Sequence, residues 1–173
     1  NFIGKVTFSA AAGALLASCK RTDYQIACYT RPWFDHDYRV ALDGIAEAGY
    51  KYAGIMTDKG GRIITLDTTV EQAVSVGNEV KKRGLKVASL SAGSFNVSNS
   101  VKEGIEELKR WIDNTAGLGA PVVHLGGVTD PALADRYFEA IAECCDYAVE
   151  KDVRLSLKTH GGINSTGAGC RKY

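Results

Sequence analysis

The chain has 173 residues, which is long enough for one domain with a sizeable core. Its 21 Lys and Arg nearly balance its 20 Asp and Glu, which gives a formal net charge of +1. This balance excludes the basic stripe of nucleic-acid binders and the strong acidity of a disordered chain, so we expect no nucleic-acid partner.

The first segment has the features of an export signal. Residues 6–18 form a run of apolar and small residues, shorter than the ~20 residues of a membrane-spanning helix. Such a run is typical of the hydrophobic region of a secretion signal, and the first five residues resemble those that follow the arginines of a twin-arginine signal. Leu16-Ala17-Ser18-Cys19 looks like a bacterial lipobox, in which the cysteine is lipidated. A buried Ala-rich helix is the alternative interpretation.

We therefore expect residues 1–19 to be a signal peptide with a lipobox ending at Cys19, and residues 20–23 to be a short linker. The first residue is Asn1 rather than Met, so we expect the chain to be part of a longer protein. The mature protein is expected to be an exported bacterial lipoprotein of the periplasm or cell envelope. Its lipid anchor is the one membrane contact that we predict.

Five apolar runs of strand type follow, and four amphipathic helical stretches separate them. The predicted strands are residues 24–28, 51–56, 85–91, 121–125 and 153–157. The predicted helices begin near residues 37, 68, 100 and 130, and the first two end at residues 48 and 84. A polar, glycine-containing loop is expected at residues 57–61.

Capping-box spacing marks the starts of the second and third helices, at Thr68 with Glu71 and at Ser100 with Glu103. Apolar residues at helical spacing predict a buried face on every helix. These residues are Tyr38, Ala41, Leu42, Ile45 and Ala46, then Val70, Ala73, Val74 and Gly77, then Val101, Ile105, Leu108 and Ile112, and finally Leu133, Tyr137, Ile141, Cys144 and Ala148.

The alternation of strands and helices predicts an α/β fold with a parallel sheet, because crossover helices bring successive strands alongside one another in the same direction. A complete (β/α)₈ barrel needs at least ~200 residues, so five strands cannot close one. A doubly wound sheet is the rival, but no GxGxxG turn follows the first strand. We predict a partial (β/α)₈ TIM barrel, with residues 24–173 as its amino-terminal part.

Two candidate catalytic residues follow the fifth strand, in the sequence Lys158-Thr159-His160-Gly161-Gly162. Barrels of this type place their chemistry at the carboxyl ends of the strands. The ammonium of Lys158 is suited to act as a base, to bind a carbonyl or to bind an anionic oxygen. A lysine paired with a carboxylate at the rim is the alternative. His160 is suited to orient a hydroxyl or shuttle a proton, and a loop histidine bonded to the backbone is its alternative.

Five further residues are candidate substrate-binding groups. Trp33, Asp58 and Asn96 follow the first three strands, where an indole could stack on a sugar and the polar side chains could bind hydroxyls. His124 lies between apolar residues of the fourth strand and is expected to point into the barrel; a histidine satisfied within the core is the alternative. Asn164 begins a polar stretch that suits sugar oxygens or an ordinary turn. No Cys or His spacing predicts zinc.

Three segments of the chain carry a resemblance to a known family. They are Gln25-Ile26-Ala27-Cys28-Tyr29, Gly44-Ile45-Ala46-Glu47-Ala48-Gly49-Tyr50-Lys51-Tyr52-Ala53-Gly54-Ile55 and Leu155-Ser156-Leu157-Lys158-Thr159-His160-Gly161-Gly162. These segments look like the sugar phosphate isomerase/epimerase family, which comprises xylose isomerase-like TIM barrels.

The resemblance implies a divalent metal held by acidic and histidine ligands from the ends of strands five to eight. It also implies two glutamates that move a proton between adjacent carbons of an open-chain sugar. The strand-five ligand is usually a glutamate in that family, whereas this chain has Lys158 there. We therefore expect a divalent metal only in the full-length protein and no metal ligands within this chain.

The predicted function is a sugar or sugar phosphate isomerase/epimerase-like enzyme that transfers a proton next to a carbonyl of a small carbohydrate. The alternative is a non-catalytic or metal-free sugar-binding barrel, which Lys158 favours. A zinc nuclease on the same barrel is a third hypothesis, against which the near-neutral charge and the missing glutamate argue. The sequence leaves open whether the protein forms an oligomer.

Overall fold

The alternating runs of the sequence build one parallel sheet, seen in a computed structural model that describes residues 24–159 and 161–172. Its strands are β1 (Ala27–Tyr29), β2 (Tyr52–Ile55), β5 (Lys86–Ser91), β6 (Val122–Leu125) and β7 (Arg154–Leu157). Every neighbouring pair in the order β1-β2-β5-β6-β7 is parallel, which confirms the predicted sheet. The predicted signal peptide with Cys19, and the linker, lie outside the described residues.

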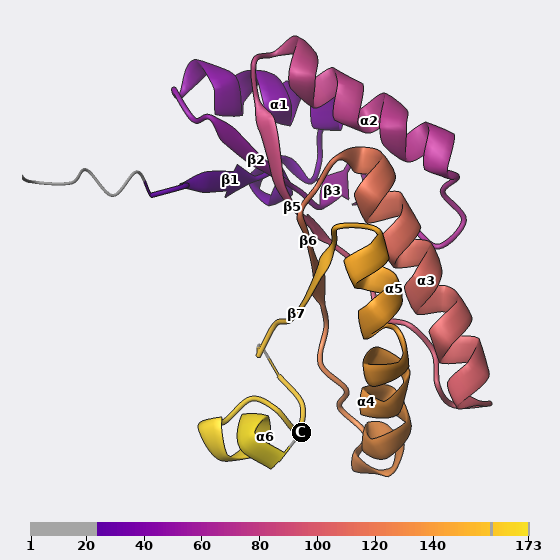
Figure 1. The fold of residues 1–173 in the computed structure, drawn as a ribbon. Helices are drawn as coiled ribbons and strands as arrows, with labels where there is room; N and C mark the ends of the chain where they lie inside the picture. Colours follow the sequence, from indigo (N-terminus) through magenta and orange to yellow (C-terminus); the bar gives the residue numbers. More distant parts are fainter. Residues whose placement is uncertain (1–23, 160, 173) are drawn as a thin grey trace, which may run out of the picture.

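The sheet order distinguishes the barrel-type fold from its rival. Strands that follow one another in the chain are neighbours in the sheet, whereas a doubly wound sheet reverses direction at a switch point. The helices that connect the strands of this sheet lie on one side of it (Figure 1). They are α1 (Tyr38–Glu47), α2 (Val70–Lys82), α3 (Val101–Leu118), α4 (Ala134–Glu143) and α5 (Cys145–Glu150). The predicted partial TIM barrel is confirmed, with β1 and β7 as the edge strands of the described sheet.

Short elements occupy the connections at the carboxyl ends of the strands. They are η1 (Arg31–Trp33), β3 (Thr57–Asp58), β4 (Gly61–Arg62), η2 (Pro131–Leu133) and α6 (Gly167–Lys172). The segment expected to be a polar loop is instead the hairpin β3–β4, whose strands pair Thr57 with Arg62 across a two-residue turn. Gly60 adopts a φ of 77° in this turn, a conformation that favours glycine.

The start of α2 differs from the prediction by one residue. Thr69, rather than Thr68, forms the capping box: its hydroxyl accepts from the N–H of Gln72, and the Gln72 side chain accepts from the N–H of Thr69. The Thr68 hydroxyl is already occupied, because it accepts a hydrogen bond from the N–H of Thr65 at 2.8 Å. The buried face of α2 is also different, since Val76 and Val80 are buried whereas Val70 and Val74, expected inside, are each 41% exposed.

The predicted fourth helix is divided into α4 and α5 at Cys144. The N–H of Cys144 bonds to the carbonyl of Ile141, three residues back, which tightens the last turn of α4. Tyr137, Cys144 and Ala148 are buried as predicted, so the break does not change which face meets the core. The central core consists of apolar side chains that the helices and strands share, among them Leu42, Ile45, Ile55, Leu90, Leu108, Ile112, Val123 and Leu125. Among the described helices none is both long and apolar enough to cross a bilayer.

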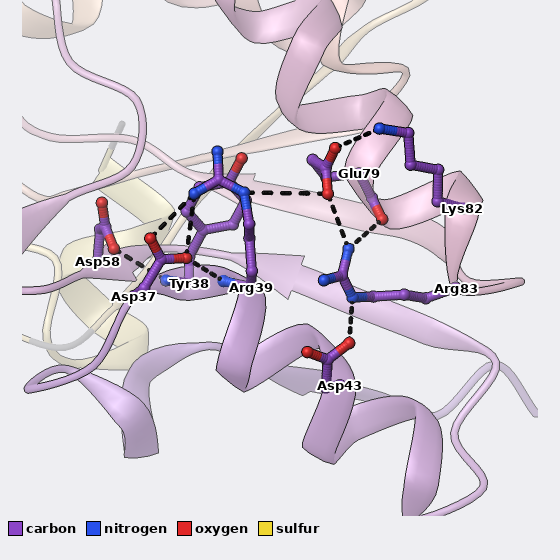
Figure 2. Close-up of polar contacts among 8 residues, drawn as sticks. All are labelled: Asp37, Tyr38, Arg39, Asp43, Asp58, Glu79, Lys82 and Arg83. Atoms are coloured by element: carbon purple, nitrogen blue, oxygen red, sulfur yellow. Dashed lines mark hydrogen bonds and ion pairs between the residues drawn. The ribbon is translucent and has the colours of Figure 1, made fainter.

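Six charged side chains join α1 and α2 on their outer surface, and we call them the α1–α2 charge cluster (Figure 2). Arg83 donates to Asp43 at 2.5 Å and to Glu79 at 3.0 Å, and Lys82 donates to Glu79 at 2.6 Å. Hydrogen bonds from Lys82 and Arg83 hold the pKa of Glu79 below its ordinary value. Each cation of the cluster therefore has a carboxylate partner. The members are Asp37, Arg39, Asp43, Glu79, Lys82 and Arg83.

Candidate functional site

A cavity opens at the carboxyl ends of the strands, and we call it the strand-end cavity. It has two lobes of about 430 and 450 Å³. Both lobes are lined by Arg31, Met56, Ser91, His124 and Lys158. The first lobe also includes Arg62, Gly126, Gly127 and Thr129, and the second also includes Tyr29, Ser156, Leu157 and Thr159. Five different strand ends therefore contribute to one hollow.

The register of the sheet aligns polar side chains beneath this cavity. Ser91, His124 and Ser156 are partners across β5, β6 and β7, so they form one row on the same face of the sheet. The flanking residues Val123 and Leu125 are buried on the opposite face, under the helices. His124 consequently points away from the apolar core and into the cavity, as its position between two apolar residues predicts.

A second polar row lies next to the first and depends on a glycine. Tyr29 pairs with Gly54, and Gly54 pairs with Ser89. The Tyr29 hydroxyl and the Ser89 hydroxyl are hydrogen-bonded at 2.6 Å. A Cβ atom at Gly54 would lie 2.6 Å from the Tyr29 ring, so only glycine allows the ring to cross β2. Tyr29 is thereby held with its ring centroid 6.4 Å from that of His124.

The environment of His124 sets its protonation. Burial lowers the pKa of His124 below its ordinary value, and the charge of Lys158 lowers it further. Both effects disfavour the imidazolium and favour the neutral form of His124. A neutral imidazole has one nitrogen that donates and one that accepts, which suits it to exchange a proton with a ligand.

Three cationic side chains reach the cavity from separate elements. Lys158 follows β7, where its N–H continues the sheet by donating to the Leu125 carbonyl at 2.9 Å. Arg31 lies in η1, and Arg62 lies in the hairpin strand β4. A guanidinium N–H of Arg62 donates to the Ser91 carbonyl at 2.7 Å, which fixes the side chain over the end of β5.

The cavity has no acidic lining among residues 24–159 and 161–172. Neither lobe includes an Asp or Glu, and no described salt bridge involves Arg31, Arg62 or Lys158. Partial burial lowers the pKa of Arg62, and the charge of Arg31 lowers it further, which shows that the two guanidinium groups repel each other. The strand-end cavity is therefore positively charged.

Glycines border the first lobe of the cavity where β6 ends. The Tyr137 hydroxyl of α4 donates to the Gly126 carbonyl and holds this loop in place. Burial raises the pKa of Tyr137, so the hydroxyl keeps its proton and remains a donor. A Cβ atom at Gly127 would lie 2.4 Å from the Asn164 side-chain oxygen. Asn164 is thus packed behind the loop, and it is only 2% exposed.

The predicted site residues do not all meet at this cavity. His124 and Lys158 line it. Trp33 packs against Gly44 of α1, and the Asp58 carboxylate accepts from the N–H of Tyr38 at 2.8 Å, at the start of α1 (Figure 2).

The other predicted residues lie behind or beside it. Asn96 accepts from the N–H of Ser98 at 2.9 Å and lines a neighbouring hollow of about 590 Å³, with which the cavity shares Gly127 and Thr129. Asn164 lies behind the glycine loop, and His160 falls outside the described residues.

Two of the three cations, Arg31 and Arg62, are not among the site residues predicted from the sequence. Arg31 lies three residues beyond the end of the first predicted strand, at residue 28, and the rule that functional groups lie at strand ends could have found it. Arg62 lies six residues beyond the end of the second predicted strand, at residue 56. Only the β3–β4 hairpin returns it to the cavity, and the turn Lys59-Gly60 was the available signal.

The described part of the chain does not by itself fit a divalent metal. Nowhere in residues 24–159 and 161–172 do three His, Cys, Asp or Glu side chains gather as candidate ligands. The cations at the strand ends would repel a metal ion, while His124 is a single ligand. A divalent metal would need ligands beyond these residues, so we derive no chemical step from one.

Comparison with known proteins places this geometry in a family. Residues 42–170 match the family model described as xylose isomerase-like TIM barrel. The chain belongs to the xylose isomerase-like TIM barrel family. This match includes β2, β5, β6 and β7 and the helices α2, α3, α4 and α5 that connect them, together with His124 and Lys158. No curated protein matches the chain in sequence.

Several solved structures share the fold at low identity. A D-psicose 3-epimerase solved in the presence of D-fructose is 14% identical, with a TM-score of 0.55; the match covers 76% of this chain and 51% of that one. The IolI protein with a bound zinc atom is 16% identical, with a TM-score of 0.57 and coverages of 78% and 51%. The apo form of the 3-keto-D-glucoside 4-epimerase YcjR from E. coli is 13% identical, with a TM-score of 0.52 and coverages of 77% and 55%. The chain thus spans about half the length of these structures, and the likeness shows the fold.

Proposed function

We propose that this protein is a sugar isomerase/epimerase-like enzyme whose chemistry takes place in the strand-end cavity. The observation that carries the proposal is that His124, whose neutral form is favoured, and Lys158 line the same hollow at the carboxyl ends of the strands. Membership of the xylose isomerase-like TIM barrel family supports a site at this end of the sheet. Two of the structures with the same fold are named as sugar epimerases, which supports a carbohydrate substrate.

The proposed reaction moves a proton next to a carbonyl. A base takes the proton from the carbon beside the carbonyl, and the C–H electron pair forms a C=C bond while negative charge develops on the carbonyl oxygen. Lys158 stabilises this oxygen by donating a charged hydrogen bond. The neutral imidazole of His124 accepts the proton. If the imidazolium returns it to the former carbonyl carbon, the hydroxyl proton of the neighbouring carbon moves to the anionic oxygen and a new carbonyl forms at that neighbour, which is isomerisation; if the proton returns to the other face of the carbon that lost it, the original carbonyl re-forms, which is epimerisation. His160 orients a substrate hydroxyl, and the row of Ser91 and Ser156 binds further hydroxyls.

The experiment that tests this proposal is proton exchange in deuterated water. The full-length protein is incubated with a panel of ketoses, aldoses, their phosphate esters and sugar acids, and deuterium incorporation beside the carbonyl is followed by NMR. Incorporation into one of these sugars, strongly reduced in Lys158→Ala, supports the enzyme. Sugar binding without any incorporation would instead support the second candidate, a non-catalytic sugar-binding barrel. That alternative is favoured by Lys158 at the strand-five end, where the family resemblance leads us to expect a glutamate.

We also propose that the enzyme is anchored in the cell envelope, because residues 6–18 form an apolar run and Leu16-Ala17-Ser18-Cys19 looks like a lipobox. In the full-length gene, Cys19→Ala should leave an unprocessed precursor that lacks the lipid anchor, whereas Cys145→Ala at an exposed cysteine should mature normally. Gel mobility and membrane fractionation distinguish these products. Normal anchoring of the Cys19→Ala protein would contradict the lipobox.

A further inference from the structure

We infer that the strand-end cavity selects a sugar that carries an oxyanion group, either a phosphate ester or a carboxylate, that Arg31 and Arg62 bind this group, and that the charge of Lys158, which lines both lobes, adds to the attraction. The inference rests on the proposed function for the carbohydrate part of the ligand. It deepens that proposal by naming the chemical class of the substrate.

The arrangement of charge in the cavity favours an anionic ligand. The three cations come from η1, β4 and the segment after β7, so the fold and not a local run of sequence brings them together. Neither lobe of the cavity has a carboxylate among the described residues to neutralise them. Gathering like charges costs free energy, as the effect of Arg31 on Arg62 shows, and an anionic ligand removes this cost on binding.

The N–H donors of the cavity also have a geometry that suits an oxyanion. One guanidinium N–H of Arg62 donates to the Ser91 carbonyl, which fixes the side chain without using an acidic partner. A guanidinium has five N–H donors in a planar fork that matches the oxygens of phosphate and carboxylate. Lys158 adds a point charge from the opposite edge of the cavity. A neutral hydroxyl would leave this concentration of positive charge without a partner.

The two lobes of the cavity differ in the residues that line them. Arg62 lines only the first lobe, which also contains the Gly126-Gly127 backbone. Tyr29 and Ser156 line only the second lobe, where an aromatic ring and a hydroxyl offer the mixed surface that a sugar ring needs. Arg31, His124 and Lys158 border both lobes. The oxyanion group therefore lies in the first lobe and the sugar carbons in the second, with His124 and Lys158 between them.

The test is isothermal titration of the full-length protein with D-fructose, D-fructose 6-phosphate, D-glucuronate and inorganic phosphate. At least one charged sugar should bind at least tenfold more tightly than D-fructose. Tighter binding of D-fructose 6-phosphate would indicate a phosphate ester as the ligand group, and tighter binding of D-glucuronate would indicate a carboxylate. Arg62→Gln should weaken this binding by about 10- to 100-fold, since a hydrogen bond to a charged group is worth roughly 1.5–3 kcal/mol. Arg62→Lys should recover part of the loss, because it restores the charge but not the fork.

Matched controls come from the other end of the sheet. Arg154→Gln and Lys86→Gln change exposed cations at the amino ends of β7 and β5, and both should bind the charged sugar as the parent protein does. Equal affinity for D-fructose and both charged sugars would overturn the inference, as would unchanged binding in Arg62→Gln. Binding of inorganic phosphate as tightly as D-fructose 6-phosphate would also overturn it, because the sugar would then contribute nothing. Deuterium exchange separates the two proposals: selective charged-sugar binding without exchange refutes the enzyme and leaves this inference standing.

Discussion

Two groups of cations on this molecule differ in how their charge is balanced. In the α1–α2 charge cluster, Arg83 lies between Asp43 and Glu79, and each cation has a carboxylate within 4 Å. In the strand-end cavity, Arg31, Arg62 and Lys158 have no carboxylate partner among the described residues. The first group thus links two helices through ion pairs, and we infer from the contrast that the second group binds a ligand that brings the missing negative charge.

The largest effect is expected for Lys158→Ala. Removing the ammonium that stabilises the developing oxyanion should lower kcat/KM by roughly 100-fold in the full-length protein. The free energy of unfolding should change by no more than about 0.5 kcal/mol, because Lys158 is exposed and makes no described ion pair. Steady-state kinetics and urea denaturation measure the two quantities, with Lys86→Ala as the control that should change neither. A Lys158→Ala enzyme of full activity on every sugar it binds would make the residue structural.

A carboxylate introduced into the strand-end cavity should pair with its cations, as the carboxylates of the α1–α2 charge cluster pair with theirs. Thr129 lines the first lobe and is exposed, so Thr129→Glu can be accommodated without disturbing the core. The new carboxylate competes with an anionic ligand for the same cations, and we expect at least a tenfold loss of affinity for D-fructose 6-phosphate or D-glucuronate. Thr129→Gln has a similar size without the charge and should bind nearly as the parent does. Equal affinities of the Glu and Gln variants, measured by titration calorimetry, would refute the charge argument.

A substitution in the α1–α2 charge cluster should lower the stability of the protein and leave ligand binding unchanged. Arg83→Gln removes the ion pairs to Asp43 and Glu79, and we expect the free energy of unfolding to fall by about 0.5–1 kcal/mol. The loss should shrink in 1 M salt, because screening weakens interactions between exposed charges. Urea denaturation at two salt concentrations measures this effect. Weakened binding of a charged sugar by Arg83→Gln would show that the two groups of cations are not independent.

The smallest effect concerns His124 and the pH dependence of stability. Because the folded protein lowers the pKa of His124, the unfolded chain binds its proton more readily. The stabilisation is therefore fully present above the unfolded value of about 6.5 and is lost as the pH falls below it. His124→Gln should lose less stability than the parent between pH 7.5 and pH 5.5 in chemical denaturation. Identical losses would contradict the half-buried position of His124 in the cavity that Lys158 also lines.

The sequence predicted the parts of the fold that depend on periodicity. Alternating apolar runs located the five strands, and the strand-end rule placed Lys158 at the cavity. The position of His124 between Val123 and Leu125 was enough to orient its side chain. The orientation of a strand side chain follows from the two-residue alternation along the strand, and the sequence displays this alternation directly.

Other parts of the site depend on contacts that no periodic pattern encodes. Asp58 follows a strand, yet its carboxylate accepts from the N–H of Tyr38 instead of entering the cavity. Trp33 packs against Gly44, where the missing side chain leaves room for the ring. Arg62 reaches the cavity only through the β3–β4 hairpin. At α2, Thr68 and Thr69 both suit a helix cap, and the choice depended on the contact between Thr68 and Thr65.

The most direct test of the account is an NMR titration of the His124 imidazole, which reports the charge inside the strand-end cavity. We predict that Lys158→Gln raises the pKa of His124, because it removes a neighbouring positive charge, and that Lys86→Gln at the amino end of β5 leaves it unchanged. Saturation of the parent protein with the charged sugar that it binds should raise the same pKa, because the ligand adds negative charge to the cavity. A His124 pKa that moves with neither Lys158→Gln nor the ligand would contradict a positively charged site at the strand ends.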